Sequence, residues 1–404
     1  MIKTSGASAF GCALLFCVTL SLPAQTITDR NTDPAWLSLE RGKQAYASRG
    51  FGDAIVAFDR AINVRRTAFA AAADRLDKAL SAKTIKTAND SIKLALANLA
   101  AEDLLQRDYA LIVRSHGSST KTLLEAIRKE RISESHRAFI EVLLQVLEYR
   151  PIESLDDSIQ AMRSVVARLQ RYPEAEYWKG KVFMLEGEMA LAESQMQRAL
   201  SMRDSLEIPD EQYTIMYSMA DLYGARDDYV AWENEMNAIV AGDASLDPYL
   251  EDAMMATLVD GGFNRFMVLY RIEPTYALEA NAALAEFYLD RGRAAAMLHA
   301  AVALNMTLTR AVNMLRAKDR DFSWTTLQNF MKLALQRSEV TEFLESARLY
   351  RQMLTLADAM YIAGARTNAI QLWKAIVSVG ILPQSSVASA RLADPSTAVR
   401  RSAP

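Results

Sequence analysis

Helix-breaking residues are scarce along this chain. It contains 15 glycines and 10 prolines among 404 residues, about 6% together, whereas the two types make up about 12% of an average protein. Glycine and proline are the residues that interrupt helices most strongly. Because 51% of the residues are also hydrophobic, the composition predicts long, packed helices joined by short turns.

The first 24 residues have the pattern of a secretory signal peptide. A basic residue, Lys3, precedes an apolar run from position 9 to position 22, and Pro23 and Ala24 then lead into a polar segment. We expect cleavage after Ala24, followed by a linker over 25–34. An uncleaved anchor stays an alternative, but the run is shorter than the roughly 20 residues that span a bilayer. No later segment is apolar enough to span, so the mature chain is expected to have no transmembrane segment.

Both cysteines lie inside this apolar run. Removing Cys12 and Cys17 with the signal peptide leaves a mature chain without disulfides, thiol nucleophiles or cysteine-bound metals. A lipid anchor is the weaker alternative, because Phe16 rather than a small residue precedes Cys17. An exported helical protein without cysteines is expected in the periplasm or cell envelope of a Gram-negative-type bacterium.

Charge is balanced along the chain. Lysine and arginine number 46, aspartate and glutamate 49, and the formal net charge is -3. Nucleic-acid binding requires a basic face. The sequence therefore predicts no nucleic-acid partner.

Three segments share one pattern of small and bulky residues around a glycine-containing turn. Their matching positions are Gly42, Ala45, Ala54, Phe58 and Ala61 in the first; Gly180, Phe183, Gly187, Ala192, Met196, Ala199 and Leu200 in the second; and Ala357, Met360, Gly364, Ala369, Trp373 and Ile376 in the third. Small residues at helical spacing let two helices approach closely, and bulky ones fill the space beside them. Each segment therefore predicts a helical hairpin.

These hairpins resemble the tetratricopeptide repeat (TPR) family, with clear repeats near 35–66, 173–206 and 350–383. Arg66 replaces the closing proline of the family motif, and Ile376 replaces an alanine. The resemblance implies an all-α fold over 35–392, a right-handed superhelical solenoid of stacked antiparallel helix pairs. Gly42 and Gly180 are 138 residues apart, close to four periods of about 34, which predicts further, degenerate hairpins between them.

The exact repeat register is open over 67–172 and 307–350. Within the first of these ranges, 107–120 fits either a helix with a turn or a short strand. The polar end of the chain, 393–404, is expected to be disordered.

The resemblance also implies a binding groove lined by the first helix of each pair, which receives a peptide or helix of another protein. Carried onto this chain, the groove residues are Trp36, Leu39, Lys43, Tyr46, Glu174, Tyr177, Lys181, Met184, Arg351, Leu354, Asp358 and Tyr361. Trp36 fits equally well as a cap on the first hairpin, and Tyr46 and Tyr361 fit packing as well as binding. Family members that clamp a terminal carboxylate need lysine and asparagine where Leu39 and Lys43 stand, so that activity is not expected.

No catalytic or metal-binding pattern stands out. The three histidines, His116, His136 and His299, are far apart and form no His-Glu-x-x-His motif. The run 117–121 ends like a phosphate loop but lacks its first glycine and a preceding strand. We therefore expect a non-enzymatic interaction scaffold with no cofactor and no metal. The alternatives are a small-ligand accessory protein with an enclosed helical pocket, or an envelope enzyme such as a lytic transglycosylase.

Overall fold

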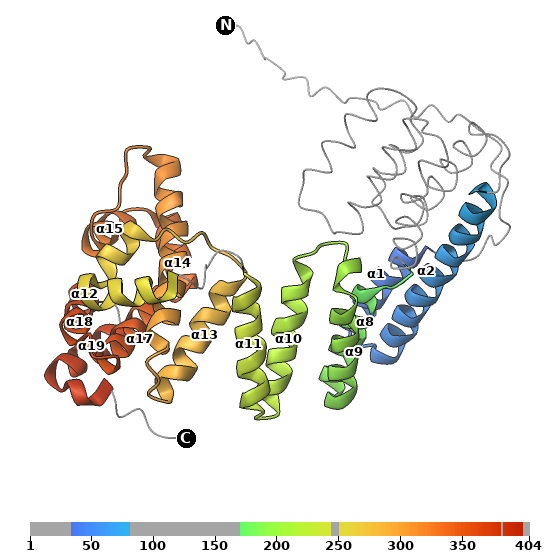
Figure 1. The fold of residues 1–404 in the computed structure, drawn as a ribbon, viewed down its shortest axis with the longest axis horizontal. Helices are drawn as coiled ribbons and strands as arrows, with labels where there is room; N and C mark the ends of the chain where they lie inside the picture. The colour runs from blue at the N-terminus through green and yellow to red at the C-terminus, as the bar shows by residue number, and fades with distance from the viewer. Residues whose placement is uncertain (1–33, 81–169, 244–249, 381–382, 399–404) are drawn as a thin grey trace, which may run out of the picture.

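The described part of the chain consists of helices joined by turns and short connections. A computed structural model describes residues 34–80, 170–243, 250–380 and 383–398, and these ranges contain no strand (Figure 1). The α-helices are α1 (Ala35–Ala47), α2 (Phe51–Leu80), α8 (Pro173–Glu186), α9 (Met189–Ser201), α10 (Glu211–Ala225), α11 (Tyr229–Gly242), α12 (Glu251–Leu269), α13 (Ala277–Asp290), α14 (Ala296–Lys318), α15 (Leu327–Ala334), α16 (Ser338–Ser346), α17 (Leu349–Ile362), α18 (Arg366–Val379) and α19 (Gln384–Ala393). The predicted all-α class is confirmed for these residues.

Most of the helices form hairpins with their neighbours in sequence. The pairs are α1 with α2, α8 with α9, α10 with α11, α13 with α14 and α17 with α18. Neighbouring pairs then contact each other through α2 and α8, α9 and α10, α11 and α13, and α14 and α17. Figure 1 shows the resulting row, from the blue pair α1 and α2 to the red helices α17–α19.

Close packing inside the first two hairpins requires glycine. A Cβ atom on Gly42 would lie 2.3 Å from Phe58 Cε1, and one on Gly180 would lie 2.8 Å from Met196 Cγ. Phe58 and Met196 are completely buried. The small and bulky positions predicted from the sequence therefore do pack against each other.

Glycine also closes two of the turns. Gly187 ends α8 in the left-handed region, with φ of 82°, and Gly364 ends α17 at 90°. Beyond each glycine, a backbone N–H returns to the helix: Glu188 donates to Phe183 O at 2.9 Å, and Ala365 donates to Met360 O at 2.8 Å. Residues with a Cβ atom are strained at such φ values, so glycine fixes where these helices stop.

The first two clear repeats lie directly against each other. The Tyr46 ring is 5.3 Å from the Trp178 ring, and Lys179 Nζ is 2.7 Å from Asp59 Oδ1. The predicted hairpins between these repeats therefore do not separate them, because a sequence separation near four periods does not require four stacked hairpins. The predictions for 81–169 lie outside the described residues, as do those for 1–33.

The repeat pattern is interrupted at two places before the last pair, at α12 and again within 307–350, where the sequence has no clear register. α12 breaks at Gly262, which has φ of 70° and ψ of -178°. Asn368 of α18 donates to the carbonyls of Leu258 and Val259, at 3.1 and 2.8 Å, and so satisfies the interrupted end of α12. Two short helices, α15 and α16, then occupy the chain before α17.

The hydrophobic core is divided along the row. One cluster joins α1, α2 and α8, a second joins α9 and α10 with partly buried side chains of α8 against it, and the largest extends from α10 to the C-terminal end. That end includes a 3-10 helix, Pro395–Ala398, in which Ala398 is completely buried. The predicted disordered tail from 393 is therefore wrong up to residue 398, because Ala398 contributes to the core.

Candidate interaction face

Predicted groove residues of the first two repeats meet on one face, which we call the N-terminal face. It comprises Lys43 and Tyr46 of α1, Glu174, Tyr177 and Lys181 of α8, and the acidic residues Glu207, Glu211 and Asp221 in and before α10. Helix pairing brings these side chains together, because α8 contacts both α1 and α10.

Tyr177 lies at the centre of this face. Its hydroxyl is 3.0 Å from Ser218 Oγ of α10, and its ring is 5.8 Å from the Trp178 ring. Burial raises the Tyr177 pKa, the Ser218 hydrogen bond lowers it, and Tyr46, Glu211 and Asp221 raise it by repulsion. Tyr177 therefore stays neutral near pH 7 and offers a hydroxyl and a partly exposed ring.

Trp178 holds the α1 side of the face in place. Tyr46 meets the Trp178 ring edge-on, and Lys43 Nζ lies 5.7 Å from the centre of that ring. Both arrangements are favourable contacts with an aromatic face. Trp178 is half-buried and was not among the predicted site residues, since it stands one position after the groove position of the repeat.

Three glutamates form a carboxyl cluster where α8 approaches the start of α10. Glu174 is only 7% exposed, and its Oε1 accepts a 2.7 Å hydrogen bond from the Glu207 backbone N–H. Burial raises the pKa of Glu207 to about 7; Arg65 and Lys43 lower it, whereas Glu174 and Glu211 raise it. Burial also raises the pKa of Glu211, with Glu174 adding to the effect. The cluster therefore concentrates negative charge in a partly dehydrated place.

A buried arginine lies beneath this cluster. Arg65 of α2 is 1% exposed, and its guanidinium carbon is 4.2 Å from the centre of the Tyr172 ring. Its Nη1 atom is 3.8 Å from Glu207 Oε1. Arg65 therefore offsets part of the charge of Glu207 from below.

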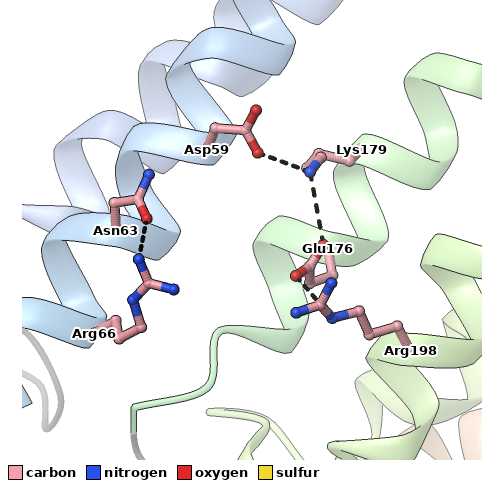
Figure 2. Close-up of polar contacts among 6 residues, drawn as sticks. All are labelled: Asp59, Asn63, Arg66, Glu176, Lys179 and Arg198. Atoms are coloured by element: carbon pink, nitrogen blue, oxygen red, sulfur yellow. Dashed lines mark hydrogen bonds and ion pairs between the residues drawn. The ribbon is translucent and has the colours of Figure 1, made fainter.

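A chain of ion pairs sets the spacing of α2, α8 and α9 (Figure 2). Lys179 Nζ lies 2.7 Å from Asp59 Oδ1 and 3.9 Å from Glu176 Oε2. Arg198 Nε of α9 is 3.2 Å from the other Glu176 oxygen. Glu176 is 3% exposed, so these cations neutralise a buried carboxylate and hold α8 in position.

A second candidate region, the C-terminal groove, lies between α13 and α17 and continues toward α19. Its larger hollow has a volume of about 510 Å³, with Glu279, Ala282 and Glu286 on one side and Arg348 and Arg351 on the other. A smaller hollow of about 170 Å³ extends it, lined by Arg351, Leu354 and the start of α19. Arg351 Nε and Nη2 each lie 2.6 Å from a Glu286 carboxylate oxygen. Two predicted residues, Arg351 and Leu354, therefore line this groove.

The remaining predicted residues have other positions. Leu39 is 7% exposed in the core of α1, α2 and α8, and Asp358 is completely buried. Asp358 accepts a 3.0 Å hydrogen bond from Trp373 Nε1 and lies 3.4 Å from Arg391 Nε. The prediction that Leu39 and Asp358 line a groove is therefore wrong, because both side chains point into the packed interior.

The other three are partly exposed. Trp36 is 37% exposed. Met184 is half-buried against the core of α8–α10, and the half-buried Tyr361 ring packs 5.4 Å from the Trp373 ring. These contacts are packing contacts, and they do not bring Met184 or Tyr361 into the N-terminal face or the C-terminal groove.

The structure bears on candidate metal ligands and histidines only within the described residues. Among them, no group of three or more histidine, cysteine, aspartate or glutamate side chains is placed to hold a metal. Burial lowers the pKa of His299 to about 4, and its Nδ1 is 2.8 Å from Asn281 Oδ1, so it is a neutral, half-buried residue. His116, His136 and the run 117–121 lie outside the described residues.

The chain shows low sequence similarity to an uncharacterized protein. No model of a known protein family matches this chain. An uncharacterized protein of Treponema pallidum (strain Nichols) is 23% identical over 384 residues, which cover 92% of this chain and 93% of that protein. The similarity therefore extends along nearly the whole of both chains. Within the described ranges, none of the helices combines the length and the hydropathy needed to cross a membrane.

Proposed function

We propose that this protein is an exported, TPR-like solenoid that binds a peptide or helix of another protein through the first helices of its pairs. The observation that carries the proposal is the meeting of α1, α8 and α10 side chains on the N-terminal face. Partly exposed aromatic rings, hydroxyls and charges lie together there. Aromatic residues beside charged groups are typical of surfaces that recognise protein segments.

The C-terminal groove supports the same proposal. It lies on α13 and α17, which are also the first helices of their pairs. Apolar positions such as Leu278 and Ala282 alternate there with Glu279, Glu286 and Arg351. An amphipathic segment would bury its apolar side on the alanines and pair its charges with the rim.

Photocrosslinking tests this proposal directly. A photoreactive residue is placed in the intact protein at Lys181 or Arg348, and at Ser194 or Lys374, which are exposed on the second helices α9 and α18. We expect a defined protein adduct from the first two positions and none from the other two. Equal labelling from all four positions, or none from any, would refute binding by the first helices.

Export is part of the proposal and rests on the pattern of residues 1–24. Fractionation of cells followed by mass spectrometry of the intact protein tests it. A periplasmic or envelope protein beginning at Gln25 supports export. A cytoplasmic protein that retains Lys3 and the apolar run contradicts it.

A small-ligand accessory protein is the second candidate function. It is favoured by the volume of the larger hollow, about 510 Å³, which lies in the range of ordinary ligand sites, about 300–1,000 Å³. Such sites are mostly apolar, whereas this one has Glu279, Glu286 and two arginines around it. A co-purified small molecule, detected by mass spectrometry after denaturation and lost in Ala282→Trp, would favour this function.

A further inference from the structure

The carboxyl cluster of the N-terminal face holds more negative than positive charge. Glu174, Glu207 and Glu211 influence one another electrostatically, and the cations beside them are Arg65 and Lys43. Lys43 Nζ also lies 2.7 Å from Glu40 Oε1 and so is shared with a fourth carboxylate. Two cations therefore lie beside four carboxyl groups and can neutralise only part of their charge.

One carboxylate oxygen in the cluster has no donor. Glu174 Oε2 is buried and makes no hydrogen bond, whereas Oε1 receives the Glu207 N–H. A buried carboxylate with an unsatisfied oxygen is unfavourable unless a cation lies nearby. Its charge therefore adds to the negative potential at Glu207 and Glu211, whose side chains reach the surface.

We infer that this cluster binds a lysine or arginine side chain of the segment that occupies the N-terminal face. The inference rests on the proposed function and adds the chemistry of the partner. A partner cation lies between the partly exposed Glu207 and Glu211 carboxylates and is attracted further by Glu174 beneath them. Apolar parts of the same segment then pack on the nearby Tyr46 and Tyr177 rings.

Acid–base behaviour supports this assignment. The pKa of Glu207 is raised to about 7 by burial and by its acidic neighbours, against the opposing effect of Arg65 and Lys43. A cation bound beside Glu207 favours the ionised carboxylate, because opposite charges stabilise each other. Affinity for a basic segment should therefore be highest above about pH 7 and should fall as Glu207 takes up a proton.

Two designed peptides test the inference on the whole mature protein. They share one amphipathic pattern of leucine and alanine, and one carries lysine where the other carries glutamate. Fluorescence anisotropy at low salt and about pH 8 measures both, since surface charges are screened less at low ionic strength. We expect the lysine peptide to bind about tenfold more tightly than the glutamate peptide.

Variants that remove one carboxylate charge show which residues cause the tighter binding of the lysine peptide. Glu207→Gln and Glu211→Gln should each weaken the lysine peptide about fivefold to tenfold, which is within the range for a partly buried charge pair. Glu186→Gln is the control, because Glu186 is exposed at the other end of α8. The loss of affinity between about pH 8 and pH 6 should be smaller in Glu207→Gln, and what remains comes from Glu211, whose pKa is also raised.

The outcomes separate the inference from the function on which it rests. Equal binding of both peptides, undetectable lysine-peptide binding, or equal effects of Glu186→Gln and Glu207→Gln would overturn the inference. A protein adduct from the Lys181 position would still support binding by the first helices in those cases. Loss of that adduct would remove the function as well.

Discussion

Lys179 of α8 holds its ammonium nitrogen 2.7 Å from Asp59 Oδ1 of α2, across a sequence separation of 120 residues. The same nitrogen lies 3.9 Å from the buried Glu176 carboxylate. A single side chain thus links the first hairpin to the second and neutralises a charge in the interface between them (Figure 2).

Replacing this lysine should loosen the junction of α2 with α8. Lys179→Met leaves Glu176 with Arg198 as its remaining cation, so we expect a loss of about 1–2 kcal/mol in the free energy of unfolding. Urea denaturation measures it. The control, Lys374→Met, changes an exposed lysine on α18 and should alter the free energy by less than about 0.5 kcal/mol; similar losses in the two variants would contradict the structure.

Two glycines of the first hairpin should respond in opposite directions to alanine. At Gly42 the new Cβ meets the buried Phe58 ring, whereas at Gly52 it meets no atom within 4 Å. Overpacking should outweigh helix propensity in Gly42→Ala and destabilise the protein by about 1–2 kcal/mol. Gly52→Ala should stabilise it by up to about 1 kcal/mol. Equilibrium unfolding measures the change in free energy for both variants. Stabilisation by Gly42→Ala would show that α1 and α2 lie further apart than in this structure.

Replacing the buried Asp358 should destabilise the protein more than replacing most other polar residues. Asp358→Ala removes the acceptor of Trp373 Nε1 and the partner of Arg391. Leaving a buried donor and a cation without partners should cost about 3 kcal/mol. Asp260→Ala, on the exposed side of α12, is the matched control. Near-UV circular dichroism would report Trp373 directly, and an unchanged spectrum and stability in Asp358→Ala would contradict the buried arrangement.

Stability should fall as pH rises from about 4.5 to about 7 because of Glu207. Its pKa is about 7 in the folded protein, raised from 4.5 by burial, so the folded state binds more protons than the unfolded state in this window. Above pH 7 Glu207 is ionised in the folded protein and the whole destabilisation applies. We expect it to lower the free energy of unfolding by about 1 kcal/mol, a modest loss because water reaches part of the side chain. Thermal unfolding at several pH values should show a smaller decline in Glu207→Gln; an identical decline in both proteins would contradict the raised pKa.

The hairpins could be predicted from sequence because their packing rules are local. Gly42 faces Phe58, and Gly180 faces Met196, within single hairpins whose spacing the residue pattern already fixes. Arg351 and Leu354 line the C-terminal groove, and binding by these two residues stays a prediction.

Other parts of the site depend on contacts that repeat positions do not encode. Glu207 lies in the connection between α9 and α10, outside the repeat pattern, and its chemistry comes from Glu174 and Arg65 on other helices. Asp358 is buried because α19 supplies Arg391 and covers it. The direct junction of α2 with α8 was missed because a period count cannot distinguish stacked hairpins from an insertion.

That junction has a consequence for folding order. Helical hairpins such as α8 with α9 form from residues close in sequence, whereas the contact of Asp59 with Lys179 closes a loop of 120 residues in the unfolded chain. Chain entropy makes this closure costlier than that of a loop of about four residues by about 3 kcal/mol. Contacts of high contact order form late. We therefore expect the N-terminal face, which exists only where α1 meets α8 and α10, to be completed after the individual hairpins have formed.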